Sequence, residues 1–351
     1  MPAKSGIGNV TAATDLLEMA MAYSRSCVLN AGARLGVADA LGDAERSASE
    51  IAVACQADAA SIYRLLRAMA SLGLLEETKP QHFRLTALGQ PLRKNVPDSA
   101  WSSVVFWADL LADFWSQLTG CVRTGQNAAQ VMAQTGRPSR WSQDPEANAI
   151  FRAVMGTAPT EDYAPIAAAW PFPASGVVAD LGGGGGSLIR AVLERHPKLR
   201  GMLVDREESI EAAAAHFKES ATADRCELIV ADLVEGVPPG ADVYMLKHVL
   251  HGCTDDKAVA ILRHCRAVVP PTGRLLVIEF VLPDVVPAHA PELVLRFMSD
   301  INMMAVTGGR ERSEREWRQL LEEAGFTLTR NIPVAELDVS ILEAHSMSAP
   351  K

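Results

Sequence analysis

Apolar residues in the first quarter of the chain recur at the spacing of a helix face. These residues are Ile62, Leu65, Leu66, Met69 and Leu72. The pattern predicts an amphipathic helix that ends at Gly73. Residues 74–89, LLEETKPQHFRLTALG, then have the alternation of two short strands, and we expect them to turn at Lys79-Pro80.

Helices followed by a two-stranded wing indicate a winged-helix domain. One function of such a domain is DNA binding, but the helices before the wing carry few clustered basic residues. A second apolar stripe precedes them, formed by Leu16, Met19, Ala20, Tyr23 and Cys27. An isolated chain would leave this stripe in water, which costs a free energy of about 25 cal/mol for each Å² of exposed apolar surface. We therefore interpret the region as a dimerisation module and expect a homodimer.

Apolar and β-branched runs alternate with helical periodicity from Val177 onward. The predicted strands are 177–179, 201–204, 227–230, 241–246, 275–280, 326–329 and one near 339–345. This order indicates a doubly wound α/β sheet, which binds ligands at the carboxyl ends of its strands. Polar residues lie at or just beyond those ends, namely Asp180, Asp205, Asp232, His251 and Glu279.

Five consecutive glycines, 182–186, follow the first of these strands and precede a helix. Such a loop brings backbone N–H groups close to a ligand, and Asp205 at the end of the next strand is placed to bind ribose hydroxyls. Neither GxGxxG nor GxxxxGK[ST] fits in any frame. The loop therefore favours a ribose-containing ligand without a pyrophosphate, of which S-adenosylmethionine is the common one; a flexible glycine linker is the alternative.

Length and composition agree with this picture. A chain of 351 residues, 48% of them hydrophobic, suggests roughly two domains with sizeable cores. The net charge of −9 argues against nucleic-acid partners, and no 18-residue apolar run or signal-peptide pattern appears. The six cysteines form no CxxC pair, so we expect reduced core thiols in a cytoplasmic protein.

His251 is the predicted general base. Thr254 is a plausible N-cap for the helix that follows, which places His251 in a strand-to-helix loop above the sheet. A neutral imidazole there can accept the proton of a substrate hydroxyl. Glu279 and Glu311 are candidates to orient its other nitrogen, or surface ion-pair members. His248, His251 and Cys253 could suggest a metal, but no zinc-type spacing completes the set, and we expect none.

At these residues the chain resembles the family of S-adenosylmethionine-dependent small-molecule O-methyltransferases, which includes caffeate and hydroxyindole enzymes and antibiotic-tailoring members. The motifs are DLGGGGGS, VPPGADVYMLKHVLHGCTDDKAVAILRHC, GRLLVIEFVLP and MMAVTGGRERSEREW. The resemblance implies a Rossmann-like methyltransferase sheet with an N-terminal, mainly helical winged-helix dimerisation domain. It places the catalytic histidine at His251 and its flanking acids at Glu279 and Glu311. Gly252 and Cys253 stand where the family usually has Asp-Trp.

The resemblance also implies a division of the chain and a set of binding residues. We expect a dimerisation domain over 1–100, a helical connector over 101–170 that contributes to the substrate pocket, and a cofactor-binding catalytic domain over 171–351. The predicted cofactor residues are Asp180, Gly182, Gly184, Asp205, Asp232, Leu233 and Lys247. The predicted substrate residues are Phe151, Met155, Met298, Asn302 and Met303.

The sequence therefore predicts metal-independent methyl transfer from S-adenosylmethionine to a hydroxyl of a small aromatic or polyketide-type metabolite. Two alternatives remain open. One is a hydroxylase, decarboxylase or pericyclase that keeps the cofactor on the same fold. The other is a winged-helix regulator that senses a metabolite, which would need a basic recognition helix.

Overall fold

The computed structural model describes residues 12–134, 136, 144–156, 160–218, 220–288 and 290–347. The chain forms two compact units. The first comprises residues 1–113 and 140–151, and the second comprises residues 114–139 and 152–351. Both units therefore contain part of the 101–170 segment that we predict as a connector.

The first unit contains the predicted helix and wing. Its helices are α1 (Ala12–Arg34), α2 (Val37–Leu41), α3 (Ala48–Ala54), α4 (Ala59–Ser71), α5 (Trp101–Val105), the π-helical turn Phe106–Leu110, the start of α6 (Leu111–Trp115) and most of α9 (Pro145–Gly156). Its antiparallel sheet has the order β1-β3-β2, with β1 at Arg46–Ser47, β2 at Leu75–Lys79 and β3 at His82–Leu85. Lys79 belongs to β2, so the wing turns at Pro80-Gln81 and the prediction of Lys79-Pro80 is wrong by one residue.

The second unit is built on a seven-stranded sheet of order β11-β12-β8-β7-β4-β5-β6. The strands are β4 (Gly176–Leu181), β5 (Leu199–Asp205), β6 (Cys226–Val230), β7 (Val243–Lys247), β8 (Arg274–Glu279), β11 (Phe326–Val334) and β12 (Val339–Ser346). Strands β4 to β8 are parallel, and β12 is antiparallel to both β8 and β11. All seven predicted strands are confirmed. The order reverses between β4 and β7, where open α/β sheets bind ligands.

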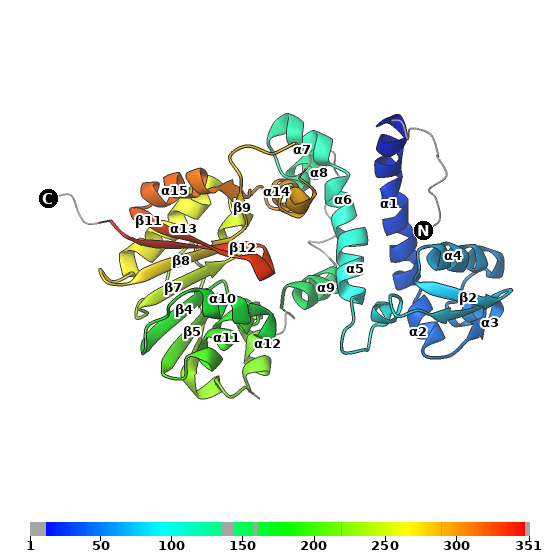
Figure 1. Ribbon diagram of the computed structural model, residues 1–351, viewed down its shortest axis with the longest axis horizontal. Helices are drawn as coiled ribbons and strands as arrows, with labels where there is room; N and C mark the ends of the chain where they lie inside the picture. The colour runs from blue at the N-terminus through cyan, green and yellow to red at the C-terminus, as the bar shows by residue number, and fades with distance from the viewer. Residues whose placement is uncertain are drawn as a thin grey trace, which may run out of the picture. The chain divides into compact units, whose positions relative to one another are not determined.

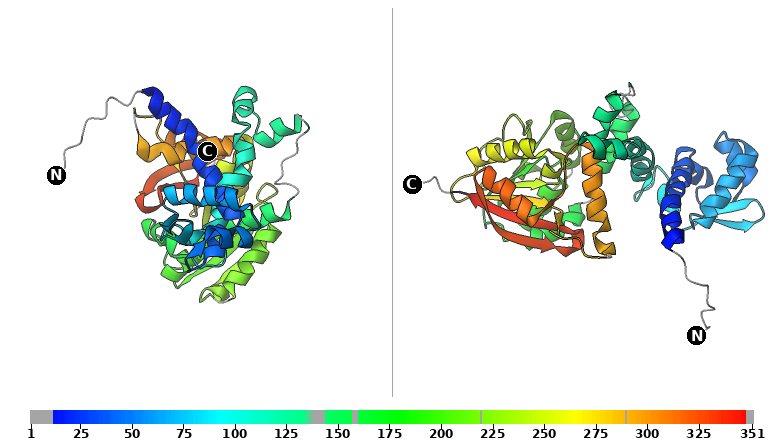
Figure 2. Two further views of the ribbon diagram at one scale, coloured as in Figure 1. Left: turned by 90° about the vertical axis from the view of Figure 1, so that its right-hand side faces the viewer. Right: turned by 90° about the horizontal axis from the view of Figure 1, so that it is seen from above.

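Helices cover both faces of this sheet (Figure 1). The helices α10 (Ala164–Ala169), α11 (Ser187–Arg195) and α12 (Glu207–Phe217) pack on one face. The helices α13 (Asp255–Val268) and α15 (Glu314–Glu323) pack on the other, where Figure 2 shows them in front of the strands in its second view. Each face carries its own buried apolar cluster, as expected for strands buried on both sides.

A short parallel ladder lies beyond the main sheet. It joins β9 (Val281–Leu282), which follows β8, to β10 (Arg312–Ser313), which precedes α15. Helix α14 (Val294–Val306) lies between these two strands in the sequence. The remaining helices described in this unit are α7 (Leu118–Thr124) and α8 (Ala128–Gln134). Short 3₁₀ turns occur in the first unit at Gln90–Leu92 and in the second unit at Thr160–Tyr163, Ala223–Arg225, Leu250–Gly252, Pro291–Leu293 and Ala335–Leu337.

Two smaller expectations are corrected by the structure. All six cysteines are free, but Cys27 is exposed on α1 and is not a core thiol. Within the described part of the chain, no helix combines the length and hydrophobicity that crossing a bilayer requires.

Candidate active site

The glycine loop connects β4 to α11 at the carboxyl edge of the sheet. Gly182, Gly184 and Gly186 adopt φ values of 69°, 56° and 80°, which L-residues rarely occupy. A Cβ on Gly183 would stand 2.5 Å from Leu203 and 2.6 Å from Asp180. Four of the five glycines, 182, 183, 184 and 186, are therefore favoured by backbone conformation or by close packing.

Two predicted acids flank this loop. The Oδ2 atom of Asp205 accepts a hydrogen bond from the Gly184 N–H at 2.8 Å, which joins the end of β5 to the loop. Asp180 is fully buried, and neither of its carboxylate oxygens has a hydrogen-bonding partner among the described residues. Burial raises the pKa of Asp180 to about 7, against the lowering effect of Lys247. An unpartnered carboxylate beside a ligand-type loop is the kind of group that a bound cation satisfies.

The other predicted cofactor residues lie at neighbouring strand ends. Leu233 is buried and approaches Gly182, whereas Asp232 is exposed and its Oδ1 accepts from the Val234 N–H at 2.9 Å. Lys247 ends β7, and its ammonium lies over the ring of Tyr163 at 4.8 Å. Burial lowers the pKa of Lys247 despite the opposing effects of Glu279 and Asp180. A cavity of about 250 Å³ is lined by Asp162, Tyr163, Lys247, His248, Leu337 and Val339.

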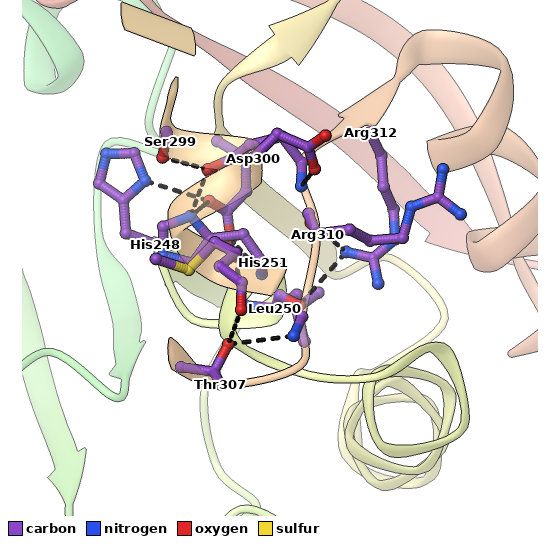
Figure 3. A network of polar contacts seen from close by, with 12 residues as sticks. His248, Leu250, His251, Ser299, Asp300, Thr307, Arg310 and Arg312 are labelled. Atoms are coloured by element: carbon purple, nitrogen blue, oxygen red, sulfur yellow. Dashed lines mark hydrogen bonds and ion pairs between the residues drawn. The ribbon is translucent and has the colours of Figure 1, made fainter. Parts of the chain in front are cut away.

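His251 lies in the predicted loop, inside the 3₁₀ turn between β7 and α13. Thr254 occupies the N-cap position of α13, as predicted, although its side chain makes no capping hydrogen bond. The adjacent His248 has a φ of 52° and stacks on His251, with ring centroids 5.1 Å apart. The loop thus presents two imidazoles side by side, drawn in Figure 3.

Glu279, at the end of β8, fixes the conformation of this loop by hydrogen bonds to its backbone. Its Oε1 accepts hydrogen bonds from three consecutive backbone N–H groups, those of Val249, Leu250 and His251, at 3.1, 3.1 and 3.3 Å. Its Oε2 lies 3.1 Å from His248 Nδ1 and 3.6 Å from His251 Nδ1. The carboxylate is fully buried, so the loop conformation and the two rings depend on it.

Glu311 contacts the same histidine from a second segment. Its Oε1 lies 2.8 Å from His251 Nδ1 and also accepts from the Ser299 hydroxyl at 2.7 Å. Its backbone N–H donates to Asp300 Oδ1 at 2.8 Å, and Figure 3 shows these contacts from α14. Both predicted acids therefore lie at His251, and neither forms a surface ion pair.

The charges of these carboxylates set the proton affinity of the rings. Burial alone would lower the pKa of His251, but Glu279 and Glu311 outweigh it and raise that pKa above its usual 6.5. For His248 burial prevails over Glu279 and lowers the pKa. Burial opposes ionisation of Glu279 as well, yet the two histidines outweigh it and lower its pKa.

Arg312 is a part of the site that the sequence did not reveal. It is 1% exposed, and it donates to the carbonyl oxygens of Leu250 and Cys253 on either side of His251, both at 3.3 Å. It also contacts the Asp255 carboxylate at 2.6 Å and lies over the ring of Trp317. In the sequence, only its position next to the predicted site residue Glu311 indicated that Arg312 could belong to the site. His248 and Ser299 were likewise not predicted as site residues.

The ladder between β9 and β10 explains how two distant acids meet. Its register pairs Val281 with Arg312, so the chain positions just after Glu279 and Glu311 run side by side. Ser313 then begins α15 with a capping box, in which its hydroxyl accepts from the Glu316 N–H and the Glu316 carboxylate accepts from the Ser313 N–H. The end of β8 and the start of α15 are thereby fixed to each other.

The predicted substrate residues belong to different units. Phe151 lies in the first unit, with its ring centroid 6.1 Å from that of Phe106. Met298, Asn302 and Met303 lie on α14 in the second unit; Met298 is exposed, and the buried Asn302 accepts from the Trp115 indole N–H at 3.1 Å. The side chain of Met155 lies outside the described residues.

Comparisons with known proteins agree with this architecture. A family model described as an O-methyltransferase domain matches residues 115–327, and one described as an O-methyltransferase dimerisation domain matches residues 17–95. The O-demethylpuromycin-O-methyltransferase of Streptomyces alboniger is 37% identical over 94% of this chain and 88% of its own. The mitomycin biosynthesis 6-O-methyltransferase of Streptomyces lavendulae is 36% identical over 90% of this chain and 89% of its own.

A solved structure gives the same result. An O-methyltransferase from neocarzinostatin biosynthesis, in complex with S-adenosylmethionine and 2-hydroxy-5-methyl naphthoic acid, matches with a TM-score of 0.79 and 30% identity. The match covers 98% of this chain and 100% of that one. On these grounds the chain belongs to the O-methyltransferase family, as a member that combines a dimerisation domain with a methyltransferase domain.

Proposed function

We propose that this protein methylates a hydroxyl group of a small aromatic metabolite, using S-adenosylmethionine as donor and His251 as general base. The observation that carries the proposal is the 2.8 Å contact between His251 Nδ1 and Glu311 Oε1. The relatives named above act in pathways to puromycin and mitomycin, and the naphthoic acid bound to the neocarzinostatin enzyme is aromatic. These names support an aromatic acceptor for this chain.

The residues at the glycine loop fit the cofactor. The loop supplies main-chain donors, Asp205 supplies a carboxylate for the ribose hydroxyls, and Asp180 supplies a buried carboxyl group whose oxygens have no hydrogen-bonding partner among the described residues. Lys247 and Leu233 would border the same site, and the exposed Asp232 would accept from the adenine amino group. S-adenosylmethionine carries its methyl on a sulfonium, which is already activated for displacement, so the chain needs to supply positioning and proton removal.

The contact with Glu311 determines which ring nitrogen of His251 acts. An ionised carboxylate can only accept hydrogen bonds, so the Nδ1 atom that faces it carries the ring proton. The neutral ring then has its lone pair on Nε2, and this atom would remove the proton of the acceptor hydroxyl. When the ring becomes an imidazolium, Glu311 and the nearby Glu279 stabilise its charge in a buried environment.

The acceptor-binding residues, the metal-independent reaction and the dimer are also proposals. The acceptor would contact Met298, Asn302 and Met303 of α14, while roles for Phe151 and Met155 rest on the family resemblance alone. The reaction as proposed uses no metal. Two chains would pair through α1, where Leu16, Leu17, Met19, Met21 and Tyr23 are all more than 60% exposed.

The test is replacement of His251 by Ala, with two separate measurements. Methyl transfer to phenol, hydroxynaphthoate and hydroxyquinone acceptors should fall roughly 10²–10⁴-fold, the usual scale for a general base. Calorimetric affinity for S-adenosylmethionine should stay within a factor of about three, since the ring is not part of the glycine-loop site. Full activity of this variant would contradict the role of His251 as the base.

A further inference from the structure

The two histidines and the buried Glu279 form a cluster whose spacing suits a divalent metal. A ring nitrogen of His248, a ring nitrogen of His251 and a carboxylate oxygen of Glu279 all lie within 4.8 Å of one another. No other group of this kind occurs among the residues that the structure describes. Imidazole and carboxylate are the donors that zinc binds in sites with two histidines and a glutamate.

The measured separations agree with a tetrahedral site. Zinc bonds to nitrogen and oxygen are about 2.0–2.1 Å long, so neighbouring ligands of a tetrahedron lie about 3.3 Å apart. Glu279 Oε2 is 3.1 Å from His248 Nδ1 and 3.6 Å from His251 Nδ1. Glu311 Oε1, 2.8 Å from His251 Nδ1, lies beside these three ligands without belonging to their cluster.

Charge and burial point the same way. The Glu279 and Glu311 side chains are buried together, and Glu311 Oε2 has no hydrogen-bonding partner among the described residues. Asp300 adds a third carboxylate at the Glu311 backbone, and Lys247 is the cation that interacts with Glu279. A buried group of acids gains from a dication more than an exposed one does, and here the nearby cations are Lys247 and the buried Arg312.

From this geometry we propose that His248, His251 and Glu279 form an inhibitory zinc site, with a water as the fourth ligand. The metal would bind both histidines through Nδ1. At each ring the N–H bond at Nδ1 breaks, a bond from Nδ1 to zinc forms, and the proton is taken up at Nε2 by way of solvent, so each neutral ring keeps one proton.

The consequence for His251 is a change of tautomer. Its Nε2 then carries a hydrogen and has no lone pair with which to accept the proton of a hydroxyl. Zinc therefore blocks the base without displacing the cofactor. This inhibitory effect rests on the proposed role of His251, whereas the binding of the metal does not.

The test is titration of the full-length dimerisation-competent chain, freed of any histidine tag, with zinc chloride. Calorimetry should give one tight site, and a chelator should reverse both binding and inhibition. His248→Asn removes one ligand but no residue of the proposed mechanism, and should weaken zinc binding at least about tenfold. The exposed His216 of α12 gives the matched control, and His216→Asn should leave the zinc affinity unchanged.

The outcomes separate the two proposals. Zinc binding that is equal in the wild type and His248→Asn overturns the metal site, as does its absence in the wild type. Zinc binding that depends on His248 but leaves methyl transfer unaffected supports the metal site and contradicts His251 as the base. Inhibition that His248→Asn relieves, with S-adenosylmethionine affinity unchanged by zinc, supports both.

Discussion

Gly309 lies directly against the backbone of His251. A Cβ at position 309 would stand 2.0 Å from the His251 carbonyl oxygen and 2.7 Å from the Gly252 carbonyl carbon. The next residue, Arg310, donates its N–H to that same carbonyl oxygen at 2.9 Å. The segment that carries Glu311 is thus held at hydrogen-bonding distance from the loop that carries the proposed base.

We predict that Gly309→Ala will lower kcat by roughly 10–100-fold, because the added methyl group must move the His251 loop by an amount that matters for proton transfer. Gly252→Ala is the control on the same loop, since a Cβ there would meet nothing within 4 Å. Steady-state kinetics of the two variants, with melting temperatures to confirm folding, compare them. Equal loss of activity in both would show that the close approach at Gly309 has no special role.

Arg312 should act on the geometry of His251 without contacting the substrate. Arg312→Lys keeps the charge but loses the planar group that reaches Leu250, Cys253 and Asp255 together. We expect kcat to fall about tenfold or more while the affinity for S-adenosylmethionine is retained. Arg315→Lys changes an exposed arginine of the helix that follows, α15, and should be neutral. An unaltered kcat for Arg312→Lys would remove this positioning role.

Asp180 should make the stability of the free protein depend on pH. Its pKa is about 7 in the folded state and 3.8 in its ordinary state, so between these values the folded protein binds more protons than the unfolded chain. Its contribution to the free energy of unfolding therefore decreases as pH rises from about 4 to 7, by about 4 kcal/mol for the full difference, and is constant above 7.

Denaturant unfolding of the wild type and of Asp180→Asn, measured from pH 5 to pH 8, tests this effect. The variant should gain stability relative to the wild type as pH rises, because the amide stays neutral. Asp224→Asn, an exposed change, should follow the wild type at every pH. A constant difference between Asp180→Asn and the wild type would mean that the buried carboxyl does not titrate in this range.

Asp205→Asn tests the cofactor site while keeping an oxygen that can accept the Gly184 N–H. Loss of the charge should weaken binding of S-adenosylmethionine roughly 10–100-fold, because hydrogen bonds to a charged acceptor contribute about 1.5–3 kcal/mol. Isothermal titration calorimetry measures it, with Asp224→Ala as the control. Wild-type affinity in Asp205→Asn would place the ribose elsewhere.

The exposed half of α1 should mediate self-association. Met19 and Met21 are 73% and 65% exposed, and acidic substitutions there would put charge into an apolar interface. We expect the double variant Met19→Asp, Met21→Asp to be monomeric in light scattering and poorly active. Val122→Asp introduces the same change at an exposed site on α7 and should leave the assembly intact. A dimer that survives the double substitution would show that another surface forms it.

The sequence predicted the parts of the fold that depend on periodicity or on an unusual composition. The seven strands follow from apolar runs, and the loop 182–186 follows from the conformations that only glycine adopts readily. Glu279 and Glu311 were only alternative candidates from the residues, and the family resemblance was needed to place both at His251, because the ladder that joins their segments has two residues per strand and no periodic signal.

Other features depend on tertiary contacts that a single sequence does not display. Arg312 looks like any charged residue near a helix start, and its burial under the His251 loop becomes visible only in three dimensions. Thr254 has the residue type of an N-cap without making the bond. The wing turns one residue later than predicted, because Gln81 takes the left-handed conformation after Pro80.

The ladder between β9 and β10 has a consequence for how new acceptor specificities can arise. Residues 283–311, which include α14, are an excursion that leaves the fold at one strand of the ladder and returns at the other. Sequence changes within this excursion can reshape a binding surface while its two ends stay paired and the acids stay in place. Ser299 and Asp300, which bond to Glu311, and Gly309 and Arg310, which contact the His251 loop, are the described positions of this excursion that the site constrains. Substitutions on the rest of α14 can therefore change which acceptor binds without changing the position or the pKa of His251.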